Sequence, residues 1–145
     1  MSVPHLLFSR DDDLEKKECA SRLCIEGHKN RFGYGVPTNL LRAFQLYTEA
    51  GRLGDLDALT CAGILLEEGL VDPGTDYDDL VSDLALTGSA ARRYYEVAAR
   101  QGHADALFRL GKMTEGGQGA IPADPVHAGK LYAEAAKLGH AEAQV

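Results

Sequence analysis

The chain has 145 residues, 45% of them hydrophobic, which is enough for one domain with an apolar core and too few for two. Its formal net charge of −7 disfavours nucleic acid and anionic membrane surfaces as partners. No segment approaches the roughly 18 to 20 apolar residues of a membrane-spanning helix, and the start of the chain lacks the basic region of a secretory signal. Cys19, Cys24 and Cys61 are odd in number and form no CxxC pair, which indicates reduced thiols in the cytoplasm and gives no support for zinc.

From the N-terminus onward, two kinds of helix are predicted to alternate. Helices of the first kind, the A helices, each carry two glycines six residues apart: Gly27 and Gly33, Gly63 and Gly69, Gly111 and Gly117. A glycine within a helix costs about 1 kcal/mol relative to alanine. We therefore expect a neighbouring helix to approach the first glycine of each pair where a Cβ would clash. The second glycine is expected to end the helix in the left-handed conformation.

Each A helix is followed by a B helix of recurring sequence. The three copies, AFQLYTEA, ARRYYEVA and AGKLYAEA, lie at residues 43–50, 91–98 and 128–135. Their shared positions fall at i, i+3, i+4 and i+7, which places them on one helical stripe facing a core. The intervening residues Arg92, Arg93 and Lys130 are assigned to the solvated face. Because one such unit cannot bury its apolar face alone, the recurrence predicts an all-α solenoid.

The middle repeat is longer than its neighbours, and the excess lies between its A and B helices at residues 70–88. A Pro-Gly pair beginning at Pro73 predicts a turn there. After the turn, Leu80 and Leu84 are expected to form one or two helical turns that pack on the solenoid.

The same insertion is rich in aspartate, at Asp72, Asp76, Asp78, Asp79 and Asp83. Several carboxylates on one loop suit a hard cation such as calcium. Against calcium, Tyr77 stands where an EF-hand loop needs glycine, and Asp83 stands where it needs a bidentate glutamate. The favoured interpretation is a solvated acidic loop that a basic partner can dock on. No metal or other cofactor is expected.

Asp55, His103 and His140 occupy the same repeat position, at the start of an A helix. Because a side chain there can cap the helix N-terminus, we interpret the two histidines as caps rather than as metal ligands or general bases. The glycine-rich stretch 115–119 lacks the Lys and Ser/Thr of a P-loop and is interpreted as a turn. The serines lie near no histidine, and the cysteines sit in apolar helix patterns, so no catalytic residues and no enzyme activity are expected.

Further residues carry a family resemblance: the GYGV stretch at 33–36, then Ala43 and Tyr47, and the segments AARQGHADA at 98–106 and AAKLGHAEA at 135–143. They make the chain similar to Sel1-like repeat proteins, relatives of tetratricopeptide repeat proteins. The resemblance implies an α/α superhelical solenoid of helix-turn-helix repeats and a role as a scaffold or adaptor. It also implies the following division: an N-terminal extension at 1–18, repeats at about 19–54, 55–102 (with the insertion at 70–88) and 103–139, and the start of a further repeat at 140–145.

Two residues of the first A helix depart from the family pattern. Glu26 and Asn30 stand where the family prefers apolar or aromatic side chains. The first repeat is therefore interpreted either as a weak repeat or as a terminal cap.

In solenoids of this kind the concave surface is lined mainly by the A helices. The stripe predicted to face outward supplies the candidate partner-binding residues: His28, Arg31, Thr60, Ile64, Glu67, Phe108, Lys112 and Glu115. Ile64 and Phe108 are apolar at these positions, which suits anchors for a partner. The alternative interpretation is that both pack on the adjacent repeat.

We therefore expect a non-enzymatic adaptor that binds a protein partner. Its C-terminal end is expected to be covered by further repeats or by another chain. The alternatives are a structural subunit docked permanently in a large assembly and, less favoured, a metal-dependent or enzymatic domain.

Overall fold

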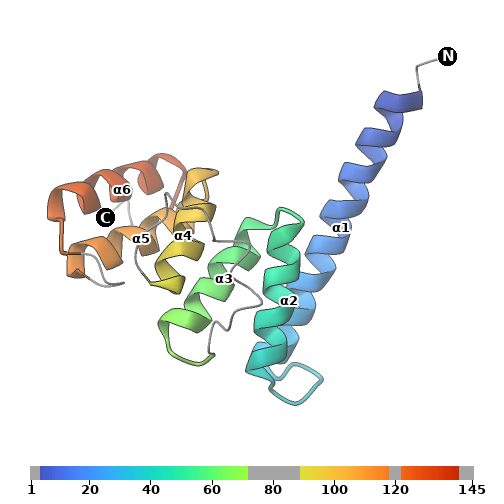
Figure 1. Cartoon of the computed structure of the whole chain (residues 1–145), viewed down its shortest axis with the longest axis horizontal. Coiled ribbons are helices and arrows are strands. Elements are labelled where there is room, and N and C mark those ends of the chain that lie inside the picture. The colour runs from blue at the N-terminus through green and yellow to red at the C-terminus, as the bar shows by residue number, and fades with distance from the viewer. Residues whose placement is uncertain (1–3, 72–88, 118–121, 141–145) are drawn as a thin grey trace.

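The computed structural model describes residues 4–71, 89–117 and 122–140. These residues form six α-helices: α1 (Pro4–Phe32), α2 (Leu40–Arg52), α3 (Leu56–Glu67), α4 (Ala90–Arg100), α5 (Ala104–Gly116) and α6 (Pro125–Lys137). Each helix packs against the helix next to it in sequence, so the chain winds as a row of helix pairs (Figure 1). The A helices are α1, α3 and α5, and the B helices are α2, α4 and α6. The predicted all-α solenoid is confirmed.

The B helices begin at side-chain caps and bury the predicted stripe. Asn39, Ser89 and Asp124 each accept a hydrogen bond from the backbone N–H three residues ahead. A cap of this kind contributes about 1 kcal/mol. The buried stripes are Ala43, Leu46, Tyr47 and Ala50 in α2, Ala91, Tyr94, Tyr95 and Ala98 in α4, and Ala128, Leu131 and Ala135 in α6.

A glycine–tyrosine contact closes each repeat. A Cβ built on Gly27 would lie 2.6 Å from Cε1 of Tyr47, and one built on Gly63 would lie 2.7 Å from Cε1 of Tyr95. The third repeat has the same contact between Gly111 and Tyr132, at 2.8 Å. Because real Cβ atoms do not approach other atoms this closely, each tyrosine ring occupies the space that a side chain would need. The predicted close approach at the mid-helix glycines is confirmed.

The A helices end and begin as the sequence predicts. Gly33, Gly69 and Gly117 follow or cap the C-termini with φ of +75°, +69° and +71°, the left-handed conformation that favours glycine. At the N-termini, Asp55 caps α3 and His103 caps α5, each accepting the N–H three residues ahead. The corresponding cap by His140 would act on residues outside the described ranges.

Helix α1 is longer than a repeat helix. It begins at Pro4 and runs without interruption through the predicted extension into the first A helix. The side chains of residues 12–19 are all exposed, and Ala20, which follows them, is buried. The N-terminal half of α1 extends beyond the other helices (Figure 1). The expected turns of the 70–88 insertion lie almost entirely outside the described residues, as does the start of a further repeat after residue 140.

One charged residue was assigned to the wrong face. Arg92 is 4% exposed, although the sequence pattern placed it among solvated residues. Its Nη2 donates to Oγ1 of Thr114 at 3.0 Å, and its Nε lies 3.3 Å from Oε1 of Glu96. The pairing with Glu96 compensates the charge and allows an arginine to be buried between α4 and α5.

Candidate interaction surface

The tyrosines that cover the mid-helix glycines also position polar side chains on the A helices. Tyr95 donates to Oε1 of Glu67 at 2.5 Å, and Tyr132 donates to Oε2 of Glu115 at 2.5 Å. In the first repeat, the Tyr47 hydroxyl lies 2.8 Å from Nδ1 of His28. Each tyrosine thus links a B helix to a polar residue at the edge of its own A helix.

The phenol groups remain hydrogen-bond donors over a wide pH range. Burial, followed by the hydrogen bond to the Glu115 carboxylate and its negative charge, raises the pKa of Tyr132 to about 12. The same causes, with Glu67 as partner, raise the pKa of Tyr95 above its usual value. At neutral pH both hydroxyls are protonated and keep the two carboxylates in place.

The structure corrects two of the eight candidate residues. Thr60 and Ile64 were predicted to face outward, but they are 1% and 8% exposed. The Thr60 hydroxyl lies 3.1 Å from Nδ1 of His103, and Ile64 belongs to an apolar cluster with residues of α4, α5 and α6. The reason is that α3 lies between two neighbouring repeats, so both of its sides are covered. For Ile64 the alternative interpretation, packing on the adjacent repeat, is the right one.

Phe108 has an intermediate position. Its ring stacks on His140 with the centroids 4.5 Å apart, and it tilts against Tyr132 at 5.5 Å. Nζ of Lys112 lies 5.6 Å from the Phe108 centroid. The ring is half-buried. It packs on Tyr132 of its own repeat and on His140 at the start of the next, and it still contributes to the surface.

The remaining candidates lie at the surface of the A helices. Glu67, Lys112 and Glu115 are exposed, while His28 and Arg31 are half-buried. The structure brings Lys112 and Phe108 into contact and holds the two glutamates by hydrogen bonds. We call these residues the A face: His28, Arg31, Glu67, Phe108, Lys112 and Glu115.

The sequence interpretation missed a contact that links successive A helices. Nε2 of His103 lies 2.6 Å from Oδ1 of Asp57, and Nε2 of His140 lies 3.2 Å from Oδ1 of Asp105. His103 therefore caps α5 and contacts the first turn of α3, and His140 contacts the first turn of α5. The two aspartates stand at the same offset from their mid-helix glycines, and this shared spacing could have predicted the pairing.

Cys24 and Cys61 have the properties of packing residues, whereas Cys19 is exposed although its helix pattern predicted a buried residue. Burial, then the negative charge of Asp55, raises the pKa of Cys24 to about 12, and burial raises the pKa of Cys61 to about 11. A thiol is nucleophilic only as the thiolate, so these two groups are poor nucleophiles at neutral pH. All three cysteines are free.

Residues 4–71, 89–117 and 122–140 contain neither a metal-binding cluster nor a membrane-spanning helix. There, no group of three or more His, Cys, Asp and Glu side chains has an arrangement that could hold a metal ion. The aspartates considered for calcium lie in the undescribed 72–88 segment. No described helix combines the length and the apolar character needed to cross a bilayer.

The stacked helix pairs, the glycine–tyrosine contacts and the paired caps define a helical repeat protein of the solenoid class. The Sel1 repeat family matches residues 19–55, 88–103 and 104–140, together more than half of the chain. The chain therefore belongs to the Sel1-repeat family. The matches leave out residues 56–87, yet α3 in that gap has the same glycine–tyrosine contact as the other A helices.

Solved structures give the same fold. A Sel1 repeat protein from Oxalobacter formigenes is 27% identical with a TM-score of 0.70, over 86% of this chain and 45% of that protein. A protective antigen of uropathogenic Escherichia coli strains, which displays an SLR fold, is 22% identical with a TM-score of 0.70, over 86% and 24%. Cysteine-rich protein B of Helicobacter pylori is 20% identical with a TM-score of 0.60, over 90% and 93%.

The chain spans less than half the length of the first two of these proteins. No curated protein matches it significantly.

Proposed function

We propose that this chain is a non-enzymatic adaptor that binds a protein partner through the A face. Sel1 repeats are in general modules for protein–protein interaction, which supports the class of function. We choose the A face because tyrosine hydroxyls hold polar side chains along it. Tyr95 holds Glu67, and Tyr132 holds Glu115. The three free thiols support a reducing compartment, and we place the protein in the cytoplasm.

Fixing these side chains before binding favours recognition. Ordering a flexible side chain at an interface costs about 0.5–1.5 kcal/mol. The glutamates of the A face are already ordered, so a partner avoids most of this cost. The face also has both signs of charge, with Lys112 beside Glu115, and a partly exposed aromatic ring in Phe108. This combination suits a polar partner segment with a single apolar or aromatic anchor.

The test is affinity capture from the native cells with two variants of equal charge change. The A-face variant combines Glu67→Gln with Lys112→Glu. Glutamine keeps an oxygen that can accept the Tyr95 hydrogen bond, so the fold is left intact. The control combines Glu49→Gln with Arg42→Glu, at exposed positions of α2.

We expect the A-face variant to lose one stoichiometric partner that the wild type and the control retain, as identified by mass spectrometry. Equal retention by both variants would exclude the A face as the binding surface. A structural subunit would behave differently, because the isolated chain would be unstable and the partner would not exchange.

A further inference from the structure

The two spaces between successive B helices are filled differently. Between α2 and α4, the rings of Phe44 and Tyr94 are fully buried and meet edge to face with their centroids 6.0 Å apart. Between α4 and α6, the same repeat positions are Arg92 and Leu131. The first space therefore has an aromatic pair where the second has an arginine and a shorter aliphatic side chain.

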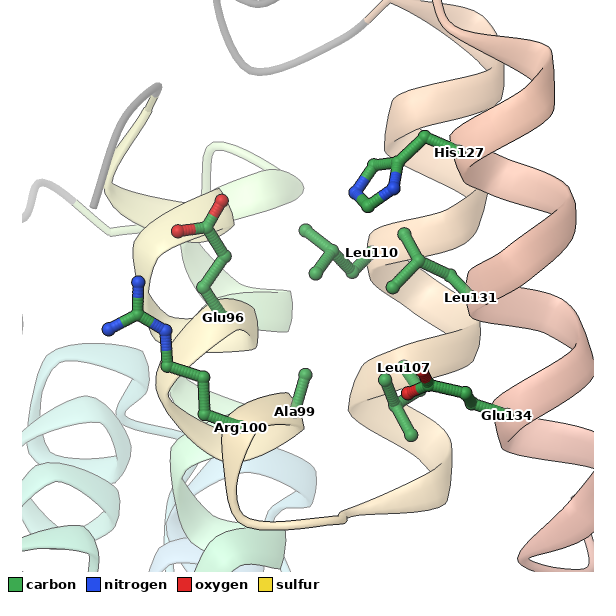
Figure 2. Close-up of a pocket in the computed structure, with 8 residues that line it drawn as sticks. All are labelled: Glu96, Ala99, Arg100, Leu107, Leu110, His127, Leu131 and Glu134. Carbon is green, nitrogen blue, oxygen red and sulfur yellow. The ribbon is translucent and has the colours of Figure 1, made fainter. Parts of the chain in front are cut away.

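Neither replacement fills the second space. The Arg92 guanidinium is held by Thr114 of α5 and Glu96 of α4. Leucine lacks the ring with which Tyr94 reaches Phe44. A hollow of about 350 Å³ remains between α4 and the α5–α6 pair (Figure 2). This volume is near the lower end of the usual range for ligand pockets, about 300–1,000 Å³, and suits one or two side chains.

The hollow has an apolar floor and a polar rim. The floor is formed by Ala99, Leu107, Leu110 and Leu131. Figure 2 shows the leucines of α5 and α6 on the side opposite Ala99 of α4. The rim is formed by Glu96, Arg100, His127 and Glu134. An apolar side chain could thus be buried here while its neighbours remain at the charged rim.

The charged residues of the rim indicate which charge an occupant should have. Glu96 pairs with Arg92, and Arg100 is engaged in interactions within the chain. By contrast, among the described residues no hydrogen bond or ion pair engages the exposed carboxylate of Glu134. The net charge of −7 adds a general attraction for cations. The carboxylate of Glu134 therefore complements a positive charge.

We propose that this hollow, the B-helix groove, binds a partner protein segment in which a large apolar side chain stands next to lysine or arginine. The apolar side chain occupies the space that Tyr94 fills in the preceding repeat, and the cation pairs with Glu134. This surface differs from the A face, so the chain can hold two partners at once.

The test uses three acetylated and amidated synthetic peptides, GKLFKG, GELFEG and GKSSKG, titrated into protein with labelled leucine methyl groups. We expect GKLFKG to shift the methyl resonances of Leu110 and Leu131, and the other two peptides to leave them unchanged. Equal shifts with GELFEG would overturn the assigned charge. The absence of shifts with all three peptides at millimolar concentration would overturn the groove as a docking site.

Two variants sharpen the test. Leu131→Tyr places a ring where α4 has Tyr94 and is expected to abolish the shift at Leu110. Glu134→Gln leaves the floor unchanged and is expected to weaken GKLFKG binding by about two- to fivefold, as for an exposed ion pair. Unchanged affinity in Glu134→Gln would contradict the proposal even if Leu131→Tyr failed to fold. The variant with Glu67→Gln and Lys112→Glu should bind GKLFKG normally, which separates this site from the A face.

Discussion

The glycine–tyrosine contact predicts that alanine at Gly63 destabilises the protein, although alanine is the better helix former. The added Cβ would lie 2.7 Å from Cε1 and 2.9 Å from Cδ1 of Tyr95. The ring cannot move away cheaply, because it is fully buried and its hydroxyl is held by Glu67. Overpacking costs about 1–3 kcal/mol and helix propensity returns about 1 kcal/mol, so Gly63→Ala should lower the free energy of unfolding by up to about 2 kcal/mol.

Whether Gly63→Ala stabilises or destabilises the protein should depend on the ring of Tyr95. In a Tyr95→Leu background the clash is removed, and Gly63→Ala should then stabilise by up to about 1 kcal/mol. Gly129→Ala in α6 is the matched control, because a Cβ at Gly129 meets nothing within 4 Å, and it should stabilise as well. Urea unfolding followed by circular dichroism measures all of these variants. Stabilisation by Gly63→Ala in the wild-type background would refute the packing argument.

Three further predictions concern stability and reactivity. Ile64→Asp should lower the free energy of unfolding in urea by at least about 3 kcal/mol, because it removes a buried apolar side chain and buries a charge; a change below about 1 kcal/mol would mean that the site is exposed. With a thiol reagent at pH 8, exposed Cys19 should react fast, while Cys24 and Cys61 react only after unfolding. Cys24 is buried, Cys61 is half-buried, and their pKa values are raised to about 12 and about 11. Three fast thiols in the native protein would contradict this. The pKa of Tyr132 rises from 10.0 to about 12 on folding, so the stabilisation by its protonated hydroxyl is complete below pH 10 and is lost as the pH rises towards 12. Between pH 10 and 12 the free energy of unfolding should therefore fall less steeply in Tyr132→Phe than in the wild type. Equal pH dependence in the two proteins would refute the assignment.

The features that the sequence predicts correctly depend on local chemistry at fixed spacing. A mid-helix glycine requires close packing, and a glycine after a helix permits the left-handed conformation, whatever the rest of the fold. Asp55 and His103 could be assigned as caps because a side-chain acceptor three residues before a free N–H is enough for that role. For such features the sequence of a single repeat is enough to make the prediction, and the same residues in the other repeats support it.

The predictions that were wrong concern residues whose neighbours in the fold come from distant parts of the sequence. The pattern of a single helix assigns one buried and one solvated side, but α3 has a repeat on each side, which covers Ile64. Arg92 is buried because Thr114 and Glu96 receive its guanidinium. The B-helix groove arises from the absence of an aromatic pair, and only the comparison of two packed repeats makes that absence visible.

Helix α1 differs from the later A helices at two positions that those helices bury. The residue before the mid-helix glycine is buried in the later A helices, as Ala62 and Leu110, but it is Glu26 in α1. Two residues after that glycine, where α3 and α5 bury apolar side chains, α1 has Lys29. Glu26 and Lys29 form an ion pair at 3.2 Å with side chains that are 49% and 44% exposed. Stacking a preceding repeat on this face would remove the ion pair from water, which is costly even for paired charges. The polar outer surface of α1 therefore favours the interpretation of the first repeat as a terminal cap over that of a weak repeat.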